Sequence, residues 1–111
     1  MDALDRDYEI VEHALCELAR AYSMPAKFRS LTAFDRIRGQ FLLIDEGWDG
    51  NSRVHRLWIH VEILNGKILI HEDGTEEGVA NLLVTAGIPR ERIVLAFYAP
   101  SLRPATDFAV A

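Results

Sequence analysis

Five ionisable side chains crowd into the eight residues "HEDGTEEG", which span 71–78: His71, Glu72, Asp73, Glu76 and Glu77. Imidazole and carboxylate groups bind divalent ions and act as general acids and bases. The same residue types also favour the start of a helix, because a short oxygen-bearing side chain caps the first turn and acids there complement the helix dipole. Since the adjacent Glu76 and Glu77 would point away from each other on a helix, we favour a helix start over a metal cluster.

A hairpin brings one part of this segment close to another histidine. The pair Asn65-Gly66 separates two β-rich runs and is typical of a two-residue type I′ turn. The register that this turn imposes places Leu64 opposite Lys67 and His60 opposite His71. His60, His71 and Asp73 then share one face, within reach of a single ion.

These three residues are candidates for a metal site, although HExxH spacing is absent and opposed histidines on a sheet surface often bind nothing. We therefore expect no metal or cofactor. The alternative function is a metal-dependent hydrolase or nuclease that uses His60, His71 and Asp73, with the ion polarising a phosphate or activating water.

Alternation along the run before the hairpin separates two faces of a strand. One face is apolar and is expected to form the core: Leu57, Ile59, Val61 and Ile63 with Ile68 and Ile70. The other face is mixed, and tryptophan and arginine are enriched at the energetic centres of protein interfaces. Its candidates for binding a partner are Arg56, Trp58, His60, Glu62 and His71.

Other chemistry finds little support. Neither the serines nor Cys16, the single cysteine, lie in a nucleophile-elbow sequence. The sequence also has no glycine-rich phosphate loop. We therefore expect no catalytic residues and no enzyme. The 12 basic and 17 acidic residues give a net charge of −5, which disfavours direct DNA binding by the chain alone.

The first element that must position these residues is an amphipathic helix. Its apolar residues recur in steps of three or four, at Leu4, Tyr8, Val11, Leu15, Leu18 and Tyr22. Asp2 is the expected N-cap, and Pro25 ends the helix soon after Tyr22. The segment "LTAFDRIRGQFLLIDEGW" then predicts two short strands with a turn at "RIRG", and "GWDGNSR" predicts a loop.

A third strand, "VHRLWIHVEIL", leads into the hairpin, and a helical pattern follows from Thr75 to Ala86 until Gly87 and Pro89 stop it. "RIVLAFYAP" predicts a last extended run, and the apolar C-terminus is expected to dock. We predict an α+β fold, a single domain over residues 1–111. Its antiparallel sheet of about four to five strands has a central meander with the Asn65-Gly66 hairpin, packed against the N-terminal helix and a second helix at about 75–87.

The N-terminus, the apolar runs and the sheet edge bear on location and assembly. The N-terminus lacks a signal peptide, and no apolar run approaches the roughly 18 residues of a spanning helix, so we expect a cytoplasmic protein and no membrane contact. An open sheet edge and one mixed face also favour a homo-oligomer, whose symmetry nothing in the sequence fixes.

Several motifs in this order resemble a known family. The run "GWDG", the segment "IHVEILNGKILIHEDGTEEGVANLLVTAGIPRERIVLAF" and the terminal "TDFAVA" are similar to the XisI family, the fdxN element excision controlling factors of cyanobacteria. The resemblance covers nearly the whole chain, including Phe34-Asp35, and is weakest in the first helix and at residues 23–30.

The resemblance implies a small α+β cytoplasmic protein associated with excision of a DNA element and usually paired with XisH, a nuclease-like partner. It assigns no catalytic residues. The main hypothesis is therefore a non-enzymatic accessory or regulatory protein that binds a XisH-like nuclease and controls it, with antitoxin-like inhibition as one version.

Overall fold

The computed structural model describes residues 2–111, and its first element is the predicted N-terminal helix. Helix α1, Ala3–Tyr22, begins after Asp2, whose carboxylate accepts a hydrogen bond from the Asp5 amide at 2.9 Å. The predicted N-cap is thus confirmed. Of the predicted stripe, Val11, Leu15 and Leu18 are buried against the sheet.

The sheet has five strands in the order β1-β2-β3-β4-β5: Phe28–Asp35, Gln40–Asp49, Ser52–Leu64, Lys67–Asp73 and Ile93–Leu95. The first four form the expected antiparallel meander. The fifth strand pairs parallel to β4, so the predicted antiparallel sheet becomes mixed at this edge. Parallel pairing arises because a helical segment returns the chain across the sheet between β4 and β5.

The predicted turns are present where glycine was expected. Gly39, at φ +68°, ends the turn between β1 and β2, and Asn65 and Gly66 have φ of +51° and +78°, as a type I′ turn requires. The loop predicted at "GWDGNSR" was wrong in its extent. Pairing continues to Asp49 opposite Ser52, so only residues 50 and 51 form the turn.

The second helix, α2, spans Val79–Thr85 and begins later than the predicted Thr75. Gly78, at φ +88°, lies outside helical geometry, and the loop before it is held by side chains. Asp73 Oδ2 accepts a hydrogen bond from the Val79 amide at 2.8 Å, and Thr75 Oγ1 accepts one from the Gly78 amide at 2.9 Å. The N-cap position is Gly78, so Asp73 binds the first amide of α2 from outside the cap position, and the acids at 76 and 77 precede the helix.

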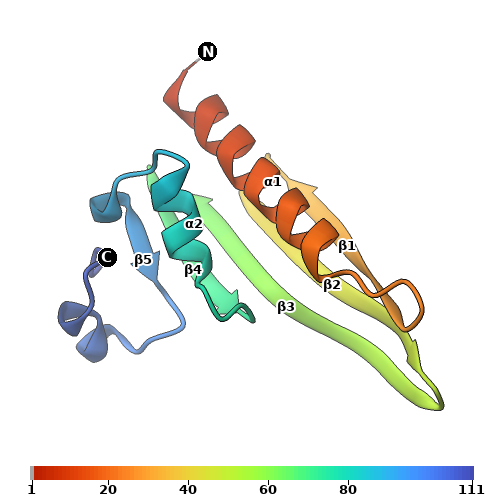
Figure 1. Cartoon of the computed structure of the whole chain (residues 1–111). Coiled ribbons are helices and arrows are strands. Elements are labelled where there is room, and N and C mark those ends of the chain that lie inside the picture. Colours follow the sequence, from red (N-terminus) through yellow and green to blue (C-terminus); the bar gives the residue numbers. More distant parts are fainter. Residues whose placement is uncertain (1) are drawn as a thin grey trace.

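Both helices cover the same face of the sheet, α1 on the side of β1–β3 and α2 over β4 (Figure 1). The core lies between these two layers and includes Phe41, Leu43, Ile59, Val61, Ile68, Ile70 and Leu83. The predicted α+β architecture is confirmed, and the helices leave most of the opposite face of the sheet open. In residues 2–111, no helix has the length and apolar character needed to cross a membrane.

The C-terminal segment docks beside β5, as expected. The Ala109 amide donates a hydrogen bond to the Ile93 carbonyl at 2.8 Å, and Phe108 packs at the border of the core. A short 3-10 helix, Pro100–Ala105, precedes this contact, and Arg103 within it donates to the Tyr98 carbonyl at 3.1 Å. The C-terminal segment thereby packs along the outer side of β5, the short last strand.

Candidate functional site

The face of the sheet that the helices do not cover presents an apolar row across three strands. Leu31 on β1 pairs with Ile44 on β2, which pairs with Leu57 on β3. Leu31 and Leu57 are 36% and 44% exposed, and Ile44 is half-buried. Adjacent large apolar side chains in one exposed row are typical of an interaction surface rather than of isolated surface residues.

A β-bulge in β3 explains why Leu57 is exposed instead of buried as predicted. Leu43 pairs with Ile59 and Ile44 pairs with Leu57, so Trp58 is an extra residue. Trp58 and Ile59 both face the core, and Trp58 is only 6% exposed. The alternation reverses at this point, because an extra residue turns every earlier side chain to the other face.

Arg56 and Trp58 consequently lie on the helix side, away from the other predicted partner-binding residues. Both nitrogens Nε and Nη2 of Arg56 donate to Asp45 Oδ2, at 3.2 and 3.1 Å, and Ser30 Oγ donates to Asp45 Oδ1 at 2.6 Å. Asp45 is 2% exposed, and the ring of Trp58 packs 5.4 Å from that of Tyr22. This group borders a cavity of about 260 Å³ near the end of α1.

A second bulge separates Asp73 from the two histidines. Val61 pairs with Ile70 as predicted, but His60 pairs with Glu72, so His71 is the extra residue of β4. Asp73 pairs with Ile59 on the core side and bonds the loop before α2, including Thr75 Oγ1 at 2.7 Å. Among residues 2–111 no group of three His, Cys, Asp or Glu side chains could hold a metal ion, so the proposed three-residue cluster is not assembled.

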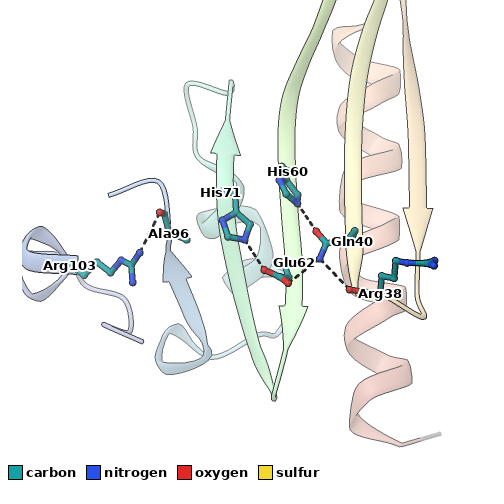
Figure 2. A network of polar contacts seen from close by, with 7 residues as sticks. All are labelled: Arg38, Gln40, His60, Glu62, His71, Ala96 and Arg103. Atoms are coloured by element: carbon teal, nitrogen blue, oxygen red, sulfur yellow. Dashed lines mark hydrogen bonds and ion pairs between the residues drawn. The ribbon is translucent and has the colours of Figure 1, made fainter. Parts of the chain in front are cut away.

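His60 and His71 nevertheless meet on the open face, with ring centroids 4.7 Å apart, inside a hydrogen-bonded network (Figure 2). Gln40 Nε2 donates to Glu62 Oε2 at 3.0 Å and to the Arg38 carbonyl at 3.2 Å. The amide oxygen of Gln40 therefore accepts from His60 Nε2, at 2.6 Å, and Glu62 Oε1 accepts from His71 Nε2 at 2.9 Å.

The network fixes the charge preferences of its members. Burial, and then the proximity of His71, lower the pKa of His60 below its ordinary 6.5. The hydrogen bond from His71 is the main cause that lowers the pKa of Glu62 below its ordinary 4.5. Near neutral pH this part of the face thus combines a neutral His60 with an ionised, hydrogen-bonded Glu62.

The network presents a set of polar groups to the surface. Its four side chains supply imidazole, amide and carboxylate groups. Their mutual hydrogen bonds hold donors and acceptors in fixed positions at the surface. A fixed polar group of this kind can select a partner by complementary hydrogen bonds.

A second polar group lies at the far end of the same face, beside the β2–β3 turn. Glu46 accepts hydrogen bonds from Arg29 at 2.9 Å and Arg53 at 2.7 Å, and these two arginines, Arg53 first, lower its pKa. The guanidinium of Arg53 also lies 5.3 Å from the ring centre of Trp48, which is exposed. Along the strands, polar groups therefore lie on both sides of the apolar row.

Sequence reasoning missed Gln40, Leu31 and Ile44 as surface residues. Between Gln40 and Glu46 both faces of the strand carry apolar residues, so the alternation of the side chains does not indicate which face is exposed. The interleaved Phe41 and Leu43 are fully buried. The sequence offered one indication: the polar Gln40 and Glu46 are six residues apart and therefore lie on the same face of the strand, which is the less buried one.

Acid should destabilise the protein in a way that depends on His60. Because the folded state lowers the pKa of His60, its stabilising contribution is complete above the unfolded value of 6.5 and declines as the pH falls below it. We expect His60→Gln to reduce the loss of the urea midpoint between about pH 7 and about pH 5.5. His55→Gln changes an exposed histidine on the same strand and should leave the loss of the urea midpoint as it is in the parent protein. An equal loss of the midpoint in the parent protein and both variants would contradict the role assigned to His60.

Known proteins are similar to this chain in both fold and sequence. A family model described as XisI protein matches residues 1–110. No curated protein matches the chain. Two solved structures from Anabaena variabilis are similar: a XisI-like protein at 33% identity, TM-score 0.89, covering 97% of this chain and 99% of that one, and the fdxN element excision controlling factor XisI at 34% identity, TM-score 0.81, covering 99% and 100%.

The matched residues include both strands that carry His60, Glu62 and His71 and the helix whose loop Asp73 holds. Agreement extends over nearly the full length of both solved relatives, at identities above 30%. The chain belongs to the XisI family.

Proposed function

We propose that this protein is an accessory regulator of DNA element excision that acts by binding a XisH-like nuclease and controlling its activity or its placement on DNA. The name of the similar Anabaena protein, an excision controlling factor, supports the regulatory part of the proposal. The sequence resemblance to a family usually paired with XisH supports the partner. Antitoxin-like inhibition is one form that this control can take.

The observation that carries the proposal is the composition of the open sheet face. Its centre is the apolar row of Leu31, Ile44 and Leu57, and the networks around Glu62 and Glu46 flank that row. Protein interfaces commonly have this arrangement, with an apolar centre that excludes water and a polar rim that sets orientation. Of the predicted partner-binding residues, His60, Glu62 and His71 belong to this face.

Arg56 and Trp58 have a different part in this proposal. The Arg56 guanidinium compensates the buried Asp45, and Trp58 packs beneath the end of α1, so both support the sheet from behind. They hold β3 in the register that exposes Leu57. Their substitution would alter binding through the shape of the strand instead of through a lost contact.

A titration with a purified XisH-like nuclease from the same organism tests the proposal. We expect a complex at micromolar concentrations or tighter, and a loss of affinity of at least about 30-fold in Leu57→Glu, because a carboxylate at the centre of the interface would be desolvated. Leu102→Glu is the matched control: Leu102 is exposed on the C-terminal 3-10 helix and should tolerate the same change.

Both variants should keep the circular dichroism spectrum and the unfolding midpoint of the parent protein. If the folded proteins form no complex at micromolar concentrations, nuclease binding is refuted. If the complex forms but Leu57→Glu and Leu102→Glu bind equally well, the open face is not the interface.

A further inference from the structure

A groove runs between α1 and α2, on the side of the sheet opposite the open face. It consists of two hollows of about 360 and 470 Å³ that share His13, Ala14 and Ala86, so they form one continuous depression. The two helices lie over different strands of the sheet (Figure 1), and residues of α1 and of the α2 segment line the hollows.

Helix α1 lines this groove with a second stripe, distinct from the one that faces the sheet. Ile10 and Ala14 lie one turn apart on the helix and Ala21 lies two turns further along, and Leu82 of α2 also lines the groove. Ile10, Ala14 and Leu82 remain half-buried although each packs against the core. The small alanines make the floor accessible, because the separation of packed helices depends on side-chain size at their contact.

The border of the groove is acidic. Three of the residues that line it are acids, Glu9, Glu17 and Glu77, whereas Arg6 is the one arginine or lysine among them. The whole chain carries the same sign, with a net charge of −5. This field favours a cationic occupant and disfavours a second copy of the chain, whose own exposed helix surface is also acidic.

The shape of the groove favours a helix as the occupant. The lining residues of α1 extend from Arg6 to Tyr22, which corresponds to about 24 Å along a helix axis. The hydroxyl of Tyr22 bonds Glu77 at 2.9 and 3.0 Å and closes one end. Because the groove lies between two helices whose backbone groups are bonded internally, it offers no strand edge, and an occupant must satisfy its own backbone hydrogen bonds.

We infer that this groove binds an amphipathic helix of about 16 residues from a protein partner, with an aliphatic face toward Ala14 and Leu82 and lysine or arginine along its borders. This second interface lies on the opposite side of the sheet from the surface assigned to the nuclease. It does not depend on nuclease binding. With both surfaces occupied, the chain holds two protein segments on its two faces.

A designed peptide tests the groove without knowledge of the natural partner. The probe is a helical peptide of about 16 residues made only of leucine and lysine, with the leucines on one face, and its counterpart has glutamate in place of lysine. We expect the lysine peptide to bind at least about tenfold more tightly than the glutamate peptide. Amide shifts of the isotope-labelled protein should change at Ala14, Ala21, Leu82 and Ala86.

Two variants with equal changes in charge distinguish binding of the peptide in the groove from general electrostatic attraction to the acidic protein. Ala86→Arg fills the centre of the groove at an exposed position and should weaken binding of the lysine peptide at least about tenfold. Ala105→Arg adds the same charge at an exposed site on the C-terminal 3-10 helix and should weaken it much less.

Equal losses in the two variants, or shift changes confined to the open face, would overturn the inference. Dimerisation of the free protein that Ala86→Arg abolishes would overturn it as well, by identifying a second copy as the occupant. Nuclease titrations with Leu57→Glu report on the other face, so the two proposals fail independently.

Discussion

Replacing Arg56 with alanine is expected to lower the free energy of unfolding by about 3 kcal/mol, because the change leaves the buried carboxylate of Asp45 without its cation. The two bonds from Arg56 to Asp45 Oδ2 would be lost, and only the hydroxyl of Ser30 would remain on that side chain. The expected cost lies at the low end for a broken buried pair, since the Arg56 side chain is itself 64% exposed and water can enter after its removal. Guanidinium titration at neutral pH measures the effect.

A double-mutant cycle distinguishes a stranded charge from lost packing. In an Asp45→Asn background, Arg56→Ala should cost less than about 1 kcal/mol, because no buried charge remains to be compensated. Arg20→Ala breaks the exposed pair with Glu17 and is the matched arginine control, expected to cost less than about 1 kcal/mol. If Arg56→Ala is as mild as Arg20→Ala, Asp45 does not depend on this cation.

The turn between β1 and β2 should be equally sensitive to a single methyl group. Gly39→Ala is expected to destabilise the protein by about 3 kcal/mol, from about 1–2 kcal/mol of left-handed backbone strain and a further steric term. The added Cβ would overlap the carbonyl oxygen of Ile63, whose amide bonds the Gly39 carbonyl at 2.9 Å. Neither group can move without breaking the ladder that joins β2 to β3.

Gly66→Ala provides the comparison, because Gly66 also has positive φ, +78°, but no atom lies within 4 Å of the position of a new Cβ. It should show the backbone strain alone, about 1 kcal/mol. Denaturant unfolding of both variants isolates the steric term as the difference between them. Equal destabilisation would mean that the region of Ile63 yields to the added methyl group.

The sequence was sufficient wherever one local signal determined the geometry. The Asn65-Gly66 turn fixed four residue pairs correctly, from Leu64 with Lys67 to Val61 with Ile70. Spacing in α1 identified the buried Val11 and Leu15, and the cap at Asp2 was correct. In each case a few neighbouring residues specify the conformation through their own backbone preferences.

The candidate site was only partly predictable, because two bulges change the register without leaving a signal in residue type. His60 was placed opposite His71, whereas it pairs with Glu72, and yet the two rings remain neighbours. At Trp58 the same effect exchanged the faces of Leu57 and Arg56. Strands of a twisted sheet can add such residues, as β3 does at Trp58 and β4 at His71, but pattern reasoning assumes constant alternation.

Long-range pairing was also beyond local reasoning. The stretch predicted as the last strand forms only Ile93–Leu95, and its parallel direction depends on where α2 returns the chain. The delayed start of α2 has a similar cause, since Asp73 bonds the loop and Gly78 breaks the helical pattern before Val79. The strand direction and the start of α2 are determined by contacts between distant segments, which local residue preferences do not describe.

The extra residue at Trp58 constrains how this family can diverge. Deleting Trp58 would close the bulge and leave Leu57 opposite Ile44 and Arg56 opposite Asp45, but it would remove the buried ring that packs on Tyr22 and leave a void beneath the end of α1. Substitutions on the open face have no such consequence, since the side chains there can change without moving the backbone. We therefore expect relatives to preserve the length of this strand while they vary the identities of its exposed residues to match different partners.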